Sequence, residues 1–143
     1  MEAKSKVTDV FLDTGYVVAL SDKNDRYHER ARGRAEQISQ EEVQVVTTQD
    51  VLVEIGNALA SVGRRSFAAK YIRAIERADP FEVAEASPEL FHRGLELYEE
   101  RQDKEWGITD CISFVTMHDR SLQAALTTDR DFVQAGFTAL LRS

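Results

Sequence analysis

Short apolar runs alternate with longer amphipathic stretches along this chain, and this alternation is typical of strands separated by helices. The first run, residues 7–12, contains four apolar residues in six, and an Asp-Thr-Gly stretch follows it. The later runs are also short and are followed by polar residues or by glycine. We expect strands over residues 7–12, 43–47, 81–84, 124–127 and 137–141.

Apolar positions recur with the helical period after Thr48, where residues 51, 52, 55, 59 and 62 share one face. Gly63 is expected to end or kink this helix. Ser87 and Pro88 predict another helix start, because serine accepts hydrogen bonds from free N–H groups and proline suits the first helical position. Thr109 is the expected cap of a later helix. We expect helices over residues 14–20, 25–39, 48–62, 66–77, 87–101 and 110–119.

Strands that alternate with helices imply crossover connections and therefore a parallel sheet with helices on both sides. The chain shows no internal repeat, no low-complexity segment and no linker. We therefore expect an α/β fold in which residues 1–143 form one domain around a central parallel sheet.

The composition fits an ordinary globular protein, with 43% hydrophobic and 30% charged residues in 143. No apolar stretch approaches the roughly 20 residues that span a bilayer, and the first residues lack the apolar region of a secretory signal. The one cysteine, Cys111, excludes an internal disulfide, and no Cys/His spacing suggests zinc. We expect a cytoplasmic protein without a membrane association.

The formal net charge of −7 argues against a broad electrostatic affinity for nucleic acid, but the charges are unevenly distributed. Residues 64–77 hold five basic residues and one acid, a local charge of +4, whereas residues 79–110 hold ten acids and three basic residues, a local charge of −7. The candidates for phosphate contacts are Arg64, Arg65 and Lys70. A solvated helix face explains the same basic run about as well.

Acidic residues follow two of the expected strands. Asp13 interrupts the apolar stretch VFLDTGYVVAL after the first strand, and Asp129 follows the fourth. Carboxyl ends of parallel strands share one rim of a sheet, so both acids are expected there. Asp110 begins a helix, whose N-terminus favours a negative charge. Glu54 lies at the border of the apolar face of its helix, where a carboxylate can point across the rim or into solvent.

Carboxylates gathered on one rim repel one another unless a cation or a proton compensates them. Oxygen ligands suit Mg²⁺ or Mn²⁺. Such an ion lowers the pKa of a bound water and stabilises charge on a phosphoryl group, which is the chemistry of phosphodiester hydrolysis. That chemistry needs no His, Ser or Cys nucleophile.

Four segments occur in an order that resembles the successive motifs of PIN-domain ribonucleases, particularly the VapC toxins. They are FLDTGYVVAL, VLVEIGNAL, DKEWGITDCISF and LTTDRDF, and together they cover nearly the whole chain. The resemblance implies a three-layer α/β/α sandwich with a PIN-like central parallel sheet and an Mg²⁺- or Mn²⁺-dependent endoribonuclease acting on RNA. It also implies a small antitoxin protein as partner and a homodimer.

The resemblance assigns metal binding and catalysis to four acids, which are Asp13, Glu54, Asp110 and Asp129. Thr14 and Asn57 match polar neighbours that support the acids and the metal-bound water. Gly107 stands where the family often has serine, and the fourth acid varies more across the family than the others.

Three other functions share parts of this pattern. An aspartyl phosphatase of the haloacid dehalogenase type needs a second acid two positions after the first, where this chain has Gly15. A two-component receiver domain needs paired acids after the first strand and a late lysine that these segments do not supply. A PIN-like module that binds RNA or protein without cutting remains the alternative.

Several residues near these motifs are open to more than one interpretation. Asp103 is expected to be a solvated loop acid and Asp131 to cap a short turn, although either can join the site. Cys111 is expected in the core. Trp106 is expected to pack against the fold or a partner rather than to stack on a base. The three histidines have no partner motif.

Overall fold

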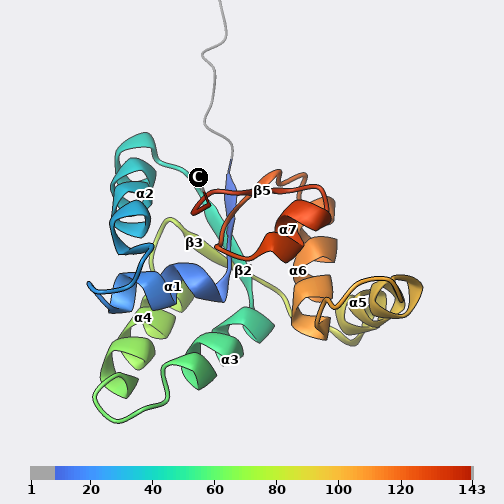
Figure 1. Cartoon of the computed structure of the whole chain (residues 1–143), viewed down its shortest axis with the longest axis horizontal. Helices are drawn as coiled ribbons and strands as arrows, with labels where there is room; N and C mark the ends of the chain where they lie inside the picture. The colour runs from blue at the N-terminus through green and yellow to red at the C-terminus, as the bar shows by residue number, and fades with distance from the viewer. Residues whose placement is uncertain (1–8, 143) are drawn as a thin grey trace, which may run out of the picture.

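The computed structural model describes residues 9–142 and arranges them around one five-stranded sheet (Figure 1). Every strand pair is parallel, and the strand order is β3-β2-β1-β4-β5. The strands are β1 (Val10–Leu12), β2 (Val45–Thr48), β3 (Phe81–Ala84), β4 (Ala124–Leu126) and β5 (Thr138–Ala139). The parallel sheet expected from the sequence is confirmed, whereas residues 7 and 8 of the first expected strand lie outside the described residues.

The central strand β1 is buried along its whole length, because strands and helices enclose it from every direction. Val10 pairs with Val45 of β2, and Leu12 pairs with Leu126 of β4. Even the polar residues of β2 are buried, and the hydroxyl of Thr47 donates to the carbonyl oxygen of Leu12 at 2.8 Å. That bond compensates the cost of removing the hydroxyl from water.

Helices lie on both sides of the sheet (Figure 1). Helices α1, α2 and α4 lie on one side, whereas α5, α6 and α7 lie on the other, and α3 packs against α1 and α4. The helices are α1 (Thr14–Ser21), α2 (His28–Glu41), α3 (Gln49–Ala58), α4 (Arg65–Arg77), α5 (Pro88–Glu100), α6 (Ile108–Asp119) and α7 (Arg130–Gln134). This arrangement confirms the expected three-layer sandwich. In the described part of the chain, no helix is both long enough and apolar enough to cross a membrane.

Two helices are shorter in the structure than the sequence predicts. Helix α3 ends at Ala58, although an apolar residue at position 62 extends its pattern. The side chain of Val62 is 98% exposed and contributes nothing to the core, and the chain turns at Gly63, where φ is +94°. Helix α2 begins three residues later than expected, because the carboxylate of Asp25 accepts the N–H of Tyr27 in a turn ahead of it.

The cap expected at Thr109 is wrong. Helix α6 begins at Ile108, and Gly107 is its N-cap residue. The carboxylate of Asp110 accepts the backbone N–H of Gly107 at 3.3 Å, so the acid at the third helical position supports the helix start. The expected cap at Ser87 is confirmed, since its hydroxyl accepts the N–H of Leu90, and the hydroxyl of Thr48 caps α3 by accepting the N–H of Val51. The short helix α7 has no counterpart among the expected helices, because it is too brief to show a helical period.

Helices α5 and α6 approach each other closely at Gly94, which is buried in the middle of α5. A Cβ atom at this position would lie 2.5 Å from Cγ1 and 3.2 Å from the backbone nitrogen of Ile112. Backbone atoms cannot move aside as the end of a flexible side chain can. The contact between these helices therefore requires glycine.

We expect Gly94→Ala to lower the free energy of unfolding by about 1–3 kcal/mol, because the added methyl overpacks the contact between α5 and α6. Gly33→Ala is the matched control, since a Cβ there has no neighbour within 4 Å on the exposed face of α2. That control should raise stability by about 0.5–1 kcal/mol. Urea denaturation of both variants measures the difference, and equal effects would contradict the close approach.

Candidate functional site

The candidate site lies at the carboxyl ends of β1 and β4, which are neighbours in the sheet. From β1 the chain continues to β2 on one side, whereas it returns from β3 to β4 on the other side. The crevice between two strands whose connections diverge in this way is the usual location of ligand sites in parallel sheets. Asp13 follows β1 and Asp129 follows β4, so the topology brings them together.

Asp13 is buried, with only 7% of its surface exposed. The hydroxyl of Thr127 donates to Oδ2 of Asp13 at 2.7 Å. Burial raises the pKa of Asp13 to about 6, and the negative charges of Glu54 and Asp129 add to this increase, whereas the bond from Thr127 opposes it. Asp13 is therefore a carboxylate that water solvates poorly and whose charge is only partly compensated.

Thr127 connects the segment after β1 with the segment after β4. Its hydroxyl donates to Asp13 and also accepts the backbone N–H of Asp129 at 3.0 Å. The residue is fully buried, so both bonds replace contacts with water. The sequence pattern places Thr127 at the end of a strand without assigning it to the site. The signal that could have found it is a hydroxyl residue at a strand end, two positions before an acid.

Asp110 and Asp129 approach the same point from two helix starts. Asp129 is the N-cap residue of α7, and its Oδ1 accepts the N–H of Asp131 at 2.8 Å. Asp110 lies in the first turn of α6 and is half-buried. Burial raises the pKa of Asp110 to about 7, and the negative charges of Asp129 and Asp13 contribute further.

Asp131 joins this pair, a possibility that the sequence leaves open. One carboxylate oxygen from each of Asp110, Asp129 and Asp131 lies within 4.8 Å of the other two. The expectation that Asp131 caps a turn is wrong, because Asp129 is the capping residue and Asp131 supplies the N–H. Burial and the charge of Asp129 raise the pKa of Asp131.

The donor set suits a divalent cation. All three ligand atoms are carboxylate oxygens, which are the ligands that Mg²⁺ and Mn²⁺ prefer. Within residues 9–142, no ion pair involves Asp13, Glu54, Asp110, Asp129 or Asp131. No basic side chain of this region therefore neutralises these acids at ion-pair distance, and a bound cation would relieve their mutual repulsion.

Glu54 reaches the site from α3. Its Oε1 accepts the hydroxyl of Thr14 at 2.9 Å, and its charge acts on Asp13. Thr14 therefore orients Glu54 directly, one residue after Asp13. Asn57 is exposed on the same helix. Of the four expected acids, Asp110 and Asp129 belong to the converging cluster, whereas Asp13 and Glu54 lie outside it. The charges of Glu54 and Asp129 act on Asp13, and Asn57 makes no hydrogen bond to any of the four among the described residues.

The expected phosphate contacts are placed around the turn between α3 and α4 and in α4 itself. Arg64 forms an ion pair with Asp22 at 3.7 Å, and Arg65 donates to the carbonyl oxygen of Ala60 at 3.0 Å. Lys70 is exposed in α4. None of the three contributes to the electrostatic environment that shifts the pKa values of Asp13 and Asp110.

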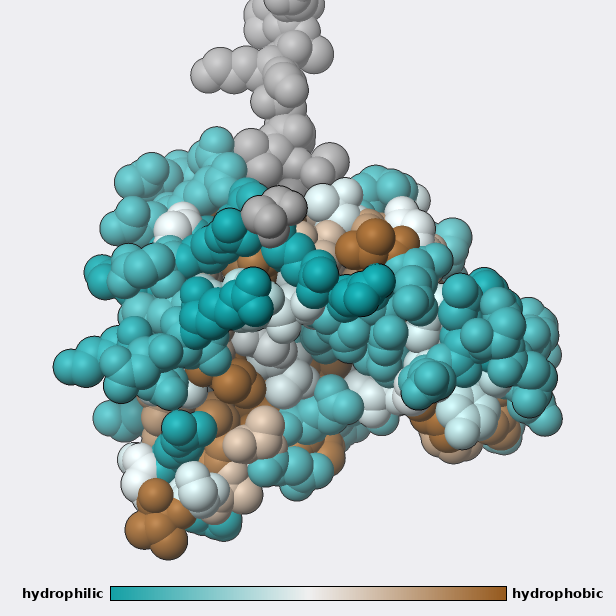
Figure 2. Space-filling model, in the orientation of Figure 1, coloured by the Kyte–Doolittle hydropathy of each residue, from teal (hydrophilic) through white to brown (hydrophobic). Residues whose placement is uncertain are grey.

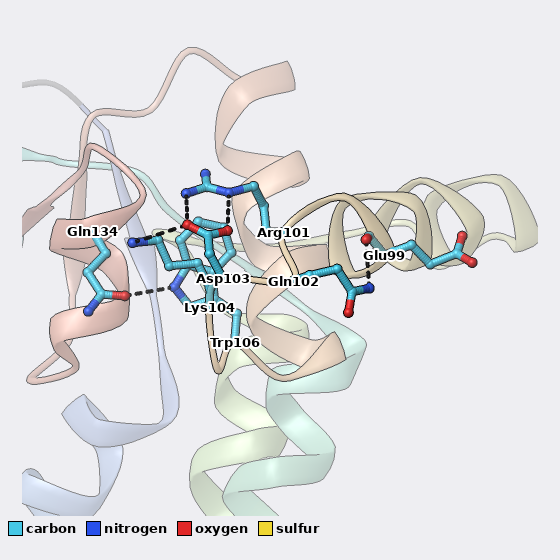
Figure 3. A network of polar contacts seen from close by, with 7 residues as sticks. All are labelled: Glu99, Arg101, Gln102, Asp103, Lys104, Trp106 and Gln134. Atoms are coloured by element: carbon cyan, nitrogen blue, oxygen red, sulfur yellow. Dashed lines mark hydrogen bonds and ion pairs between the residues drawn. The ribbon is translucent and has the colours of Figure 1, made fainter.

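A loop between α5 and α6 carries a network of polar contacts that reaches Gln134 of α7 (Figure 3). Through Asp103, Lys104 and Glu105, this loop forms one wall of a pocket that Asp129 and Asp131 also line. The guanidinium of Arg101 donates twice to Asp103, at 3.0 and 3.1 Å, and lies 4.9 Å from the ring centre of Trp106. Trp106 donates to Gln134 of α7 at 3.2 Å. Asp103 is thus a paired, exposed loop acid, as expected, and its bond with Arg101 lowers its pKa.

Trp106 has 5% of its surface exposed and packs edge-on against Phe114, which fits the expected packing role rather than base stacking. Cys111 is buried in the core, and burial raises the pKa of its thiol to about 11. The open pocket of about 640 Å³ that this wall borders is lined by Asp103, Lys104, Glu105, Thr128, Asp129, Arg130, Asp131 and Gln134.

Known proteins similar to this chain belong to one family. The profile of the PIN domain matches residues 10–138. The 23S rRNA-specific endonuclease VapC20 of Mycobacterium tuberculosis is 27% identical over 130 residues, which cover 90% of this chain and 95% of that protein.

Two solved structures resemble this fold. The crystal structure of VapC20 from Mycobacterium tuberculosis, a sarcin-ricin loop cleaving toxin, aligns with a TM-score of 0.79 and 25% identity over 91% of this chain and 97% of that chain. The crystal structure of VapBC2 from Rickettsia felis bound to a promoter DNA fragment aligns with a TM-score of 0.66 and 12% identity, covering 93% and 97%. At 12% identity, the second likeness shows the fold alone.

The raised pKa values of Asp13 and Asp110 predict how pH affects the stability of the metal-free protein. The folded state holds protons on these acids up to about pH 6 and 7, whereas their ordinary value is 3.8. Their contribution to the free energy of unfolding is therefore most favourable below pH 4 and is lost as pH rises to about 7. Removing the ionisable group should relieve this loss.

We expect Asp110→Asn to gain stability relative to the wild type between pH 4 and pH 8, by on the order of 1–2 kcal/mol, a value reduced for partial solvent exposure. Urea denaturation in EDTA at a series of pH values measures this difference. Asp103→Asn is the matched control and should show no such gain, because that carboxylate is exposed and already paired with Arg101. A difference from wild type that does not change with pH would contradict the coupling of these acids.

Proposed function

This chain belongs to the PIN-domain family, and on that premise we propose that it is an Mg²⁺- or Mn²⁺-dependent endoribonuclease that hydrolyses phosphodiester bonds in RNA. The observation that carries the proposal is the convergence of Asp110, Asp129 and Asp131 within 4.8 Å beside the buried Asp13. PIN-domain proteins are typically nucleases, and the similar VapC20 is an endonuclease.

Asp110, Asp129 and Asp131 would hold the metal ion. Asp13, which follows β1, and Glu54, which belongs to α3, would add negative charge beside it. The ion, when bound, polarises the phosphoryl group and lowers the pKa of a coordinated water. The protein residues orient these groups. Thr127 holds Oδ2 of Asp13 while it anchors the backbone of Asp129, and Thr14 holds Oε1 of Glu54. These bonds leave the carboxylates little freedom to rotate before a cation binds.

We further propose that the protein is the toxin of a toxin–antitoxin pair, with a small antitoxin protein as partner and a homodimeric state. The likeness to VapC20, a toxin, supports the toxin role. Because VapC20 is described as specific for 23S rRNA, ribosomal RNA is the first substrate to test, followed by transfer RNA.

We expect wild-type protein to cut RNA in Mg²⁺ or Mn²⁺ but not in EDTA, and Asp13→Asn and Asp110→Asn to reduce the rate at least about 100-fold. Each change removes one negative charge from the group of carboxylates that would hold and surround the metal ion. Gel analysis of a ribosomal RNA fragment and a mixed RNA pool measures the cleavage. Asp119→Asn is the control and should cut normally, because its carboxylate pairs with Arg93 outside the site.

Cleavage that persists in EDTA, or that survives in both site variants, would overturn the metal-dependent mechanism. RNA that is bound by the folded wild type but never cut would instead favour the alternative, a catalytically inactive PIN-like binding module.

The role of Asp131 has its own test. We expect Asp131→Asn to weaken Mn²⁺ binding by about 10–100-fold, because one of three converging carboxylate ligands is lost. Calorimetric titration with MnCl₂ measures the affinity. Asp103 lines the same pocket without joining the cluster, so Asp103→Asn should bind Mn²⁺ like the wild type. Equal affinities of Asp131→Asn and the wild type would remove Asp131 from the ligand set.

A further inference from the structure

A second pocket, separate from the acids, is lined by arginine side chains. It has a volume of about 250 Å³, and its lining residues are Arg26, Tyr27, Arg30 and Arg142. Arg26 precedes α2, Arg30 lies in its first turn, and Arg142 belongs to the last described segment of the chain. Figure 2 shows strongly hydrophilic side chains gathered on the face between α2 and this segment.

The positive charges in this pocket are not neutralised by neighbouring acids. Within residues 9–142, none of the three arginines forms an ion pair, and no acid lines the pocket. Elsewhere in these residues, ion pairs involve Arg32, Arg64, Arg93, Arg101 and Arg120 but not Arg34, Arg65, Arg73, Arg77 or Arg130. The pocket is distinguished because three arginines without an ion pair among the described residues line it together, in a chain of net charge −7.

Neutral partners hold these arginines in position. Arg30 donates to the carbonyl oxygen of Leu141 at 3.0 Å, and Arg142 donates to that of Thr128 at 3.0 Å. The guanidinium of Arg26 lies 5.2 Å from the ring centre of Tyr27. A guanidinium has five N–H donors, so each arginine keeps donors for a ligand. Restricting the side chains in advance reduces the entropy that binding costs.

One hydrogen bond connects a residue of the arginine pocket with Thr128 of the acid pocket. Thr128 lines the acid pocket, and its carbonyl oxygen is the acceptor for Arg142. In the other direction, a hollow of about 350 Å³ shares Arg30 and Arg142 and continues along α2 to Arg34 and Gln37. Arg142 is therefore bonded to the residue before Asp129, and the arginine-lined surface continues along α2.

A phosphate is the ligand that this chemistry favours. The planar guanidinium matches phosphate oxygens with two parallel hydrogen bonds, which an ammonium group cannot do. A strand bound at the acids carries further phosphates at regular intervals on either side. Protein contacts to such phosphates position the strand without reading its sequence.

We propose that Arg26, Arg30 and Arg142 bind backbone phosphates of the RNA strand next to the bond that is cut, a proposal that rests on the proposed ribonuclease function. The phosphate contacts expected from the sequence, Arg64, Arg65 and Lys70, stay a separate prediction, and of these Arg64 pairs with Asp22.

The test measures RNA binding separately from cleavage. Fluorescence anisotropy of a short labelled single-stranded RNA is recorded over a salt series, in an Asp110→Asn background that is not expected to cut. For a single strand, the logarithm of the binding constant falls linearly with the logarithm of the salt concentration. The slope of that line is about 0.7 for each phosphate that the protein neutralises. The combined variant Arg26→Gln, Arg30→Gln and Arg142→Gln should therefore lower the slope by about 2, with affinity about tenfold or more weaker at low salt.

Two controls separate a specific pocket from general charge and from misfolding. The combined variant Arg64→Gln, Arg65→Gln and Lys70→Gln removes the same formal charge and should keep the slope. Arg26→Gln alone breaks no hydrogen bond to the backbone, so it should lower the slope by about 0.7 without changing the melting temperature.

An equal loss of slope in both triple variants would overturn the inference, and so would a wild-type slope in the pocket variant or an absence of RNA binding in the unaltered background. Competition by polyglutamate as strong as that by RNA would overturn it in favour of an acidic protein partner.

The salt series and the cleavage assay distinguish failure of this inference from failure of the proposed function. If the pocket variant lowers the slope as expected while wild-type protein cuts no RNA, the arginines bind RNA phosphates but the proposed nuclease function fails. If wild-type protein cuts RNA normally while the slope of the pocket variant is unchanged, the nuclease function stands and the phosphate pocket fails.

Discussion

The hydrogen bonds of one buried hydroxyl, that of Thr127, join the two loops on which the candidate site depends. The group donates to the carboxylate of Asp13 and accepts from the backbone of Asp129, so the acid after β1 and the acid after β4 share one partner. A carboxylate that leaves water needs such a donor, or the charged form becomes too costly. The pairing of β1 with β4 sets the distance over which this hydroxyl can act. The sheet therefore fixes the site through its strand order as much as through its side chains.

The acids are stable in this arrangement only because the rest of the fold provides the free energy. Asp13 and Asp110 both have raised pKa values, and no basic side chain in the described region pairs with them. Around them, β1 is completely buried and α6 is buried over most of its length. Structures commonly retain such unfavourable charge at functional sites, where the binding of a ligand relieves it. The repulsion thus prepares the site for a cation.

Local patterns in the sequence predict much of this structure, whereas contacts through space escape prediction. The parallel sheet and the rim acids Asp13 and Asp129 follow from apolar runs that end in an acid. Thr127 and Asp131 are not assigned to the site by their local sequence, because a strand-end threonine and an exposed-looking acid have ordinary local explanations. The arginine pocket joins residues 26 and 142, which no short motif connects. The helix expected to reach residue 62 also ends early, since periodicity does not report whether the apolar face finds a partner.

The link between Asp13 and Thr127 spans 114 positions in the chain. During synthesis the first acid leaves the ribosome long before the threonine and the acids after β4 exist. Strand β1 also lacks one of its two neighbours until β4 emerges. A growing chain therefore cannot assemble the acid cluster until β4 and the residues that follow it have been made.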